Sequence, residues 1–249
     1  MNDIFNDKVP LKTETPAFAK HVLPAVPTSE VYLEDCVTAL KRYTDNHFDL
    51  AIVDPPYGIN VAKTGKVGGN NAGKAKDYGS KEWDKQPPDD EYFRQLFRVS
   101  KNQIVWGANH FISKMPFDSS CWLVWDKDNS GNFADCELAW TSFDTAVRKF
   151  QWRWNGMLQQ NMKDKEERIH PTQKPVALYE WILQNYAERG NLILDTHLGS
   201  GSSRIAADKG GFNFVGFEID ADYYEKSKKR FNDFKSQLRL FKRWLWHCW

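Results

Sequence analysis

The sequence predicts an α/β fold, a mostly parallel sheet with helices on both faces. Two observations lead to this prediction. Short apolar runs typical of buried strands, such as residues 48–54 and 191–195, alternate with segments of helical periodicity, as in parallel sheets. Each run ends in an aspartate, and a proline or a glycine follows within four residues. Open α/β sheets bind ligands at strand ends of this kind. At 249 residues, 41% of them hydrophobic, the chain is long enough for one domain with a sizeable core.

The chain outside this alternation divides into an arm and a long loop. Residues 1–28 contain four prolines and no sustained period, so we expect an arm over the surface and a folded domain over residues 29–249. Residues 58–90 are rich in Gly, Asn and Lys. This segment is too long and too polar for an ordinary connection, which predicts a mobile functional loop.

The regular elements follow from apolar spacing and from turn residues. The pattern predicts seven strands, of which the fourth and fifth could pair antiparallel, at residues 30–35, 48–54, 102–109, 121–127, 137–143, 191–195 and 212–220. Helices are expected at 36–45, 90–100, 174–187 and 203–210 and from 221 onward, with 235–249 as an extension of the last.

Composition excludes several classes of protein. Lys and Arg (34) balance Asp and Glu (33), so no global charge indicates a polyanionic partner. The four cysteines show no Cys-x-x-Cys pairing, which argues against a disulfide scaffold or a metal site. No apolar run approaches the roughly 20 residues of a membrane span. We therefore expect a cytoplasmic protein with no membrane or metal partner.

A glycine turn at residues 195–203, "DTHLGSGSS", predicts a nucleoside site. Asp195 ends a strand, and Gly199 and Gly201 let the backbone approach a ligand closely. Glu218 ends the next strand 23 residues after Asp195, near the roughly 20-residue offset at which a carboxylate meets ribose hydroxyls. The turn lacks the G-x-x-x-x-G-K-[ST] pattern that binds triphosphates, which favours an adenosine-containing ligand without phosphates. The alternative is a tight strand-to-helix turn with no ligand, which would also contain these glycines.

The tetrapeptide at residues 54–57, "DPPY", follows the first apolar strand. An exocyclic aromatic amine is a poor nucleophile because its lone pair is delocalised, so a catalyst must localise that pair and direct it at a methyl donor. The Asp54 carboxylate and the Pro55 carbonyl are two suitable acceptors, with Pro56 fixing the turn and Tyr57 offering a face for a stacked base. The alternative is a strand terminator of two prolines beside an acid.

Three segments in this order resemble the amino-methyltransferases that modify DNA, in the permuted class whose catalytic motif precedes the cofactor motif. They are Asp54 to Tyr57, His170 to Pro175 ("HPTQKP"), and Asp195 to Ser203 with Glu218. The resemblance implies a seven-stranded methyltransferase sheet of the Rossmann type, S-adenosylmethionine as donor, and adenine N6 as acceptor. It also implies which residues bind the cofactor: Asp35 at the adenine, Glu218 at the ribose, Asp195, His197, Gly199, Ser200, Gly201 and Ser202 at the methionine side, and His170, Pro171, Thr172, Gln173 and Lys174 at its carboxylate.

The glycine motif departs from the family pattern at one place. Thr196 and His197 stand where a Pro-Phe pair is usual, and Ser202 and Ser203 stand where a Thr pair is usual. His197 either replaces an aromatic ring against the cofactor or is a polar loop residue. Because of this departure, an alternative hypothesis is a non-catalytic nucleic-acid-binding protein with the same fold.

The resemblance implies double-stranded DNA as partner, with the target base flipped out of the helix. Two segments are candidates for DNA contact. The 58–90 loop carries lysines that could contact phosphates, and the alternative is a solvated insert. The 144–169 segment, a candidate DNA-recognition insert, contains both basic and aromatic residues, and the alternative is that its aromatic residues belong to the core. The apolar stripe of the last helix would pack on the sheet or on a second subunit, a possible homodimer. The DNA-binding candidates are Lys63, Lys66, Lys74, Arg148, Trp152 and Arg153.

The leading prediction is thus a DNA adenine-N6 methyltransferase. Cytosine N4 and RNA adenine remain alternative acceptors. A protein glutamine amide poses the same lone-pair problem, but that family opens the tetrapeptide with Asn.

Overall fold

The computed structural model describes residues 26–60, 63, 66–67, 76–77, 81, 84–129, 134–155 and 158–245, without the side chains of 66–67, 76–77 and 238–245. Most of the expected arm and of the 58–90 loop, including Lys74, lies outside the described residues. Within that loop the structure shows a short antiparallel pair, β3 (Lys66–Val67) and β4 (Lys76–Asp77).

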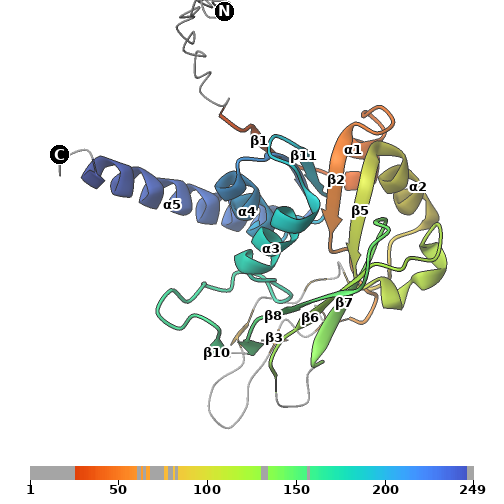
Figure 1. Cartoon of the computed structure of the whole chain (residues 1–249), viewed down its shortest axis with the longest axis horizontal. Coiled ribbons are helices and arrows are strands. Elements are labelled where there is room, and N and C mark those ends of the chain that lie inside the picture. The colour runs from red at the N-terminus through yellow and green to blue at the C-terminus, as the bar shows by residue number, and fades with distance from the viewer. Residues whose placement is uncertain are drawn as a thin grey trace, which may run out of the picture.

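A mixed sheet of eight strands, counted over the described residues, forms the centre of the fold (Figure 1). The first five strands of the sheet run parallel, β7 is antiparallel to both neighbours, and β8 is parallel to β6. In sheet order the strands are β1 (Ser29–Leu33), β12 (Asn213–Glu218), β11 (Leu192–Asp195), β2 (Phe48–Val53), β5 (Ser100–Trp106), β7 (Cys136–Thr141), β6 (Trp122–Asp126) and β8 (Arg148–Gln151).

The predicted α/β class is confirmed, and so is the antiparallel pairing of the fourth and fifth predicted strands. The strand number differs from the predicted seven because residues 148–151, expected within a recognition insert, add an edge strand to β6. The rest of the expected insert includes a small antiparallel pair, β9 (Trp154–Asn155) and β10 (Leu158–Gln159).

Helices cover both faces of the sheet, which side-chain alternation along the strands requires (Figure 1). On β2, Leu50 and Ile52 join one buried cluster, whereas Ala51 and Val53 join the other. The first cluster contains side chains of α3 (Val176–Tyr186), α4 (Ser202–Gly210) and α5 (Ala221–Leu245). The second contains side chains of α1 (Cys36–Leu40) and α2 (Asp90–Val99).

The helix expected at residues 36–45 ends at Leu40. The Arg98 guanidinium donates to the carbonyl oxygens of Leu40 (3.0 Å) and Tyr43 (2.9 Å). These carbonyls therefore bond to a side chain of α2, and the chain turns back through Asn46, which has a positive φ of 54°. Such bonds satisfy the last carbonyl groups of a short helix.

In the described part of the chain, no helix is long and apolar enough to cross a membrane. The described residues also contain no cluster of three or more His, Cys, Asp or Glu side chains suited to hold a metal ion.

Candidate active site

The carboxyl ends of neighbouring parallel strands meet at one edge of the sheet and line a single cavity of about 250 Å³. Asp54 and Pro56 follow β2, while Gly199 and Ser200 follow β11. The wall also includes Asp35, His170, Thr172, Gln173, Lys174, His197 and Glu218. The structure thus brings the two predicted strand-end motifs together around one space.

The glycine turn is held in place by Glu218. Gly199 and Gly201 have positive φ angles of 51° and 71°, a region that favours glycine. One carboxylate oxygen of Glu218 accepts from Gly199 N at 2.8 Å, and the other accepts from Asp220 N at 2.9 Å. A carboxylate oxygen has more than one acceptor site, so Glu218 can hold the turn and still meet a ribose hydroxyl.

Asp195 supports the same turn from beneath. It is buried, and its carboxylate accepts from Ser203 Oγ at 2.5 Å and from His197 N at 3.0 Å. Burial raises the pKa of Asp195 to about 7, although these two hydrogen bonds oppose the shift. Asp195 therefore titrates near neutrality and links the end of β11 to the start of α4.

His197 presents a neutral ring to the cavity. Its Nδ1 lies 2.9 Å from Thr196 Oγ1, which in turn lies 2.8 Å from Tyr92 OH. The Tyr92 ring meets the His197 ring edge-on at 5.3 Å. Burial lowers the pKa of His197 to about 4, so the ring is uncharged at neutral pH. This placement fits the hypothesis that His197 replaces an aromatic ring beside the cofactor.

The 170–174 segment forms the opposite wall. Burial lowers the pKa of His170 to about 3, and its ring packs edge-on against Tyr223 at 4.3 Å. Thr172 Oγ1 lies 3.1 Å from His170 Nδ1. Gln173 is fixed at both ends, because its side-chain oxygen accepts from Ile169 N (2.8 Å) and its carbonyl accepts from Trp154 Nε1 (2.8 Å).

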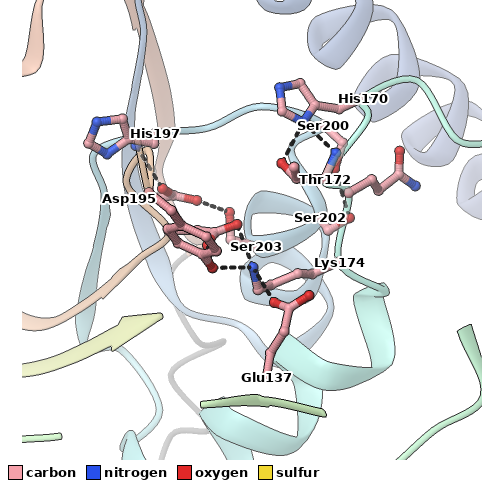
Figure 2. Close-up of polar contacts among 12 residues, drawn as sticks. Glu137, His170, Thr172, Lys174, Asp195, His197, Ser200, Ser202 and Ser203 are labelled. Atoms are coloured by element: carbon pink, nitrogen blue, oxygen red, sulfur yellow. Dashed lines mark hydrogen bonds and ion pairs between the residues drawn. The ribbon is translucent and has the colours of Figure 1, made fainter. Parts of the chain in front are cut away.

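The Lys174 side chain lines the cavity and points toward Asp54, the predicted catalytic acid, whereas the resemblance implies a cofactor contact. Its Nζ lies 2.5 Å from Asp54 Oδ2. The same Nζ lies 3.0 Å from Glu137 Oε2 (Figure 2). The other Asp54 oxygen accepts from Tyr57 OH at 2.6 Å. Burial raises the pKa of Asp54 and the Glu137 carboxylate adds to the rise, whereas the Lys174 ammonium opposes it.

The backbone of the tetrapeptide is held by Asp84, whose carboxylate accepts from Tyr57 N and from Gly58 N, both at 2.9 Å. Beside it, Gly107 has a φ of 68°, and a Cβ at this position would lie 2.0 Å from the Tyr57 ring. The Tyr57 ring stacks on His110, with centroids 4.9 Å apart and planes at 13°. The stacking surface expected of Tyr57 is therefore shared with an imidazole.

Sequence reasoning missed Glu137, Asp84 and Gly107. Glu137 had one signal, a carboxylate at the start of a predicted strand, directly before the apolar residues 138–140. Asp84 lies in the long polar loop, where an acidic residue is common and indicates no particular role. Gly107 lies near the end of a predicted strand, where a glycine is also common. All three act on residues distant in the sequence.

Of the candidate DNA contacts whose side chains the structure describes, Lys63, Arg148, Trp152 and Arg153, none lines the cavity. Lys63 and Arg148 are exposed, and Lys66 is described by its backbone alone. Arg153 forms an ion pair with Asp128 at 2.5 Å. Trp152 stacks on Phe150 (5.8 Å, 13°) against the core, in line with the core-aromatic alternative.

Known methyltransferase sequences are similar to this chain. A family model described as DNA methylase and named for N6 and N4 methyltransferases matches residues 114–229. The type II methyltransferase M2.MboI of Moraxella bovis is 24% identical to the chain, over 84% of the chain and 92% of the relative. M2.DpnII of Streptococcus pneumoniae is also 24% identical, over 79% of the chain and 87% of the relative.

Solved structures share the fold. The M1.HpyAVI structure in complex with SAM superposes with a TM-score of 0.52 at 20% identity, over 82% of this chain and 100% of that chain. The cytosine-N4-specific PvuII DNA methyltransferase superposes with a TM-score of 0.55 at 15% identity, over 84% and 88% of the two chains.

The sheet, with a glycine turn and an Asp-Pro-Pro-Tyr segment at adjacent strand ends, shares the Rossmann-like fold of DNA methyltransferases of known structure. The family match extends over the glycine turn and the 170–175 segment. In this part of its sequence the chain is similar to the DNA amino-methyltransferases.

Proposed function

We propose that this protein is a DNA amino-methyltransferase that methylates N6 of adenine in double-stranded DNA. One observation carries the proposal: Asp54, at the end of β2, and the glycine turn after β11 line the same cavity. The acid that would hold an amine and the turn that would hold a methyl donor therefore face a common space.

The cofactor is S-adenosylmethionine, which supplies an electrophilic methyl group on a sulfonium. The cavity suits it chemically, since two carboxylates, Asp35 and Glu218, are available to adenosine polar groups, and Gly199 leaves the turn without a side chain. We assign the ribose to Glu218, the adenine end to Asp35, the ring contact to His197, and the methionine end to the 170–173 segment.

Asp54 and the Pro55 carbonyl would accept the two amine hydrogens and direct the nitrogen lone pair at the methyl carbon. The N–C bond forms as the C–S bond breaks, and the C–S electron pair stays on sulfur. The nitrogen then carries a positive charge until it loses a proton, for which the Asp54 carboxylate is the nearest base. Asp54 must therefore be ionised when the methyl group moves.

Adenine is favoured over cytosine by the first residue of the tetrapeptide, because family members that open it with Ser are more often cytosine-N4 enzymes. The likeness to a cytosine-N4-specific structure shows the shared fold and keeps cytosine N4 as the second candidate. The type II methyltransferase names of the relatives support DNA rather than RNA as acceptor and suit a restriction-modification setting.

A base within a duplex cannot reach a cavity at the sheet edge, so the target adenine must flip out, at a cost of a few kcal/mol. Lys63, Lys66 and Lys74 in the 58–90 loop, with Arg148, Trp152 and Arg153, stay the proposed DNA contacts. Lys63, Arg148 and Arg153 are exposed, which supports this role, and Arg153 is also paired with Asp128.

The test is incubation with methyl-labelled S-adenosylmethionine and unmethylated plasmid DNA, followed by digestion to nucleosides. The expected product is N6-methyl-2′-deoxyadenosine from the wild type and none from Asp54→Ala, while the surface variant Asp45→Ala matches the wild type. Methylcytosine as the sole product would exclude the adenine assignment. Calorimetry that detects no S-adenosylmethionine binding would favour a non-catalytic DNA binder.

A further inference from the structure

A row of alternating charges runs from the β6–β7 hairpin to the catalytic acid. Glu137 on β7 forms ion pairs with Lys127, which follows β6, and with Lys174. Figure 2 shows the pair of Glu137 and Lys174. The Lys174 ammonium also contacts Asp54. The Lys174 side chain is only 2% exposed, so it must find its counter-charges within the protein.

The carboxylates outnumber the ammonium group beside the cavity. Burial would lower the pKa of Lys174, but Asp54 and Glu137 together raise it, so Lys174 is charged. Burial would also raise the pKa of Glu137, but Lys174 and Lys127 lower it to about 2, so Glu137 is ionised. When Asp54 is ionised, as methyl transfer requires, Asp54, Lys174 and Glu137 together carry a charge of minus one, and the partly exposed Lys127 lies at the far end.

This excess charge matters because the methylated amine is briefly a cation. A neutral Asp54–Lys174 pair would place an ammonium 2.5 Å from the oxygen that must stabilise that cation. With Glu137 neutralising Lys174, the field at the amine remains negative. Charges preorganised where charge develops are among the largest contributions to catalysis.

We propose that Glu137 is a positioning residue of the acceptor site, which through Lys174 keeps Asp54 available to stabilise the cationic amine. The proposal rests on the function proposed above, since it assumes that Asp54 faces the accepting amine. It assigns a catalytic purpose to a strand residue outside the three motifs.

Glu137 could instead merely hold Lys174 in place, and the pH profile separates the two roles. The titratable groups that face Asp54 are Tyr57, Tyr92, Glu137, Lys174, Tyr179 and Asp195, with Lys127 beyond Glu137. Because Asp195 is retained in every variant, the shift of the acidic limb between variants reports on Asp54. Activity requires ionised Asp54, so it falls as the pH drops through the Asp54 pKa. Removing the like charge of Glu137 lowers that pKa and moves the acidic limb to lower pH, whereas losing Lys174 from Asp54 moves it to higher pH.

The experiment compares Glu137→Gln, Glu137→Asp, Lys174→Met and the double variant Glu137→Gln/Lys174→Met by single-turnover methylation of unmethylated plasmid DNA across pH. Glu225→Gln, an exposed glutamate on α5, is the control. For Glu137→Gln we expect a rate about tenfold lower, a change in KM for S-adenosylmethionine within about twofold, and an acidic limb at lower pH. Glu137→Asp keeps the charge and should recover most of the rate with the limb unmoved.

The double variant removes both buried charges and should fold where a single variant does not. Assayed above its acidic limb, it should be faster than Glu137→Gln, because Asp54 again provides an uncompensated charge. An unchanged rate and limb in Glu137→Gln, or a limb that moves upward as in Lys174→Met, would overturn the proposal. Both outcomes require an active wild type; a wild type that methylates no DNA would instead refute the function proposed above.

Discussion

The two sides of the cavity are built from different interactions. On the cofactor side, Glu218 and Asp195 hold the glycine turn through backbone N–H and hydroxyl groups, and the two histidines nearby are neutral. On the acceptor side, Asp54 is held by a buried ammonium within a row of charges. Because of this difference, we expect cofactor binding to depend on the geometry of the glycine turn. Methyl transfer should instead depend on the charges around Asp54 and therefore on pH.

The largest expected effect is on the acceptor side. Asp54→Asn keeps the shape of the side chain but removes its charge, and it leaves Lys174 facing an amide. The rate of methyl transfer should fall by about 100-fold to 1,000-fold, the scale seen when a preorganised charge-stabilising group is lost. The dissociation constant for S-adenosylmethionine, measured by calorimetry, should change little. A large loss of cofactor affinity in this variant would show that the two sides are not independent.

The next effect is on the cofactor side. Glu218→Ala leaves Gly199 N and Asp220 N without their carboxylate acceptor. An unsatisfied buried donor costs about 1 to 3 kcal/mol, so unfolding by urea should show a loss of stability on this order. The KM for S-adenosylmethionine should rise much more than kcat falls. An unchanged KM would contradict the assignment of Glu218 to the ribose.

A pH effect on stability should reveal the burial of Asp195 beneath the glycine turn. Its pKa, about 7 in the fold, lies above the ordinary value of 3.8, so the folded state binds the extra proton between these values. Stability from this group is therefore highest at acidic pH and declines as the pH rises toward about 7. Asp195→Asn should flatten that decline relative to the wild type in denaturation measured across this range. An equal slope in both proteins would mean that Asp195 titrates normally.

The smallest effect concerns a contact between the long loop and α5. Lys81 Nζ lies 2.8 Å from both Asp220 and Asp222, just after Glu218, and these partly exposed pairs raise the pKa of Lys81. Lys81→Met should destabilise the protein by about 0 to 1 kcal/mol, as expected for exposed ion pairs. It should also speed the release of S-adenosylmethionine modestly in stopped-flow experiments. High salt should speed the release of S-adenosylmethionine from the wild type in the same way, because it screens the Lys81 ion pairs. A release rate that does not depend on salt would contradict a role of these ion pairs in cofactor release.

The sequence predicted the fold class and both strand-end motifs because each depends on local patterns: apolar runs, turn glycines and prolines. It did not predict that Lys174 would meet Asp54, because the 170–175 hexapeptide says nothing of where its side chains point. Glu137, Asp84 and Gly107 escaped for a related reason. Each acts on a segment at least 26 residues away, as with Asp84 and Gly58, and such proximity arises only when the sheet assembles. The edge strand at 148–151 was missed because half-exposed strands lack a long apolar run.

Gly107 contributes to the acceptor site only by lacking a side chain. Any β-carbon at this position would occupy the volume of the Tyr57 ring, and the positive φ is itself unfavourable for other residues. A saturation library at codon 107, selected for DNA modification in cells, should therefore return glycine almost alone. The end of β5 would then tolerate as little variation as the tetrapeptide it accommodates.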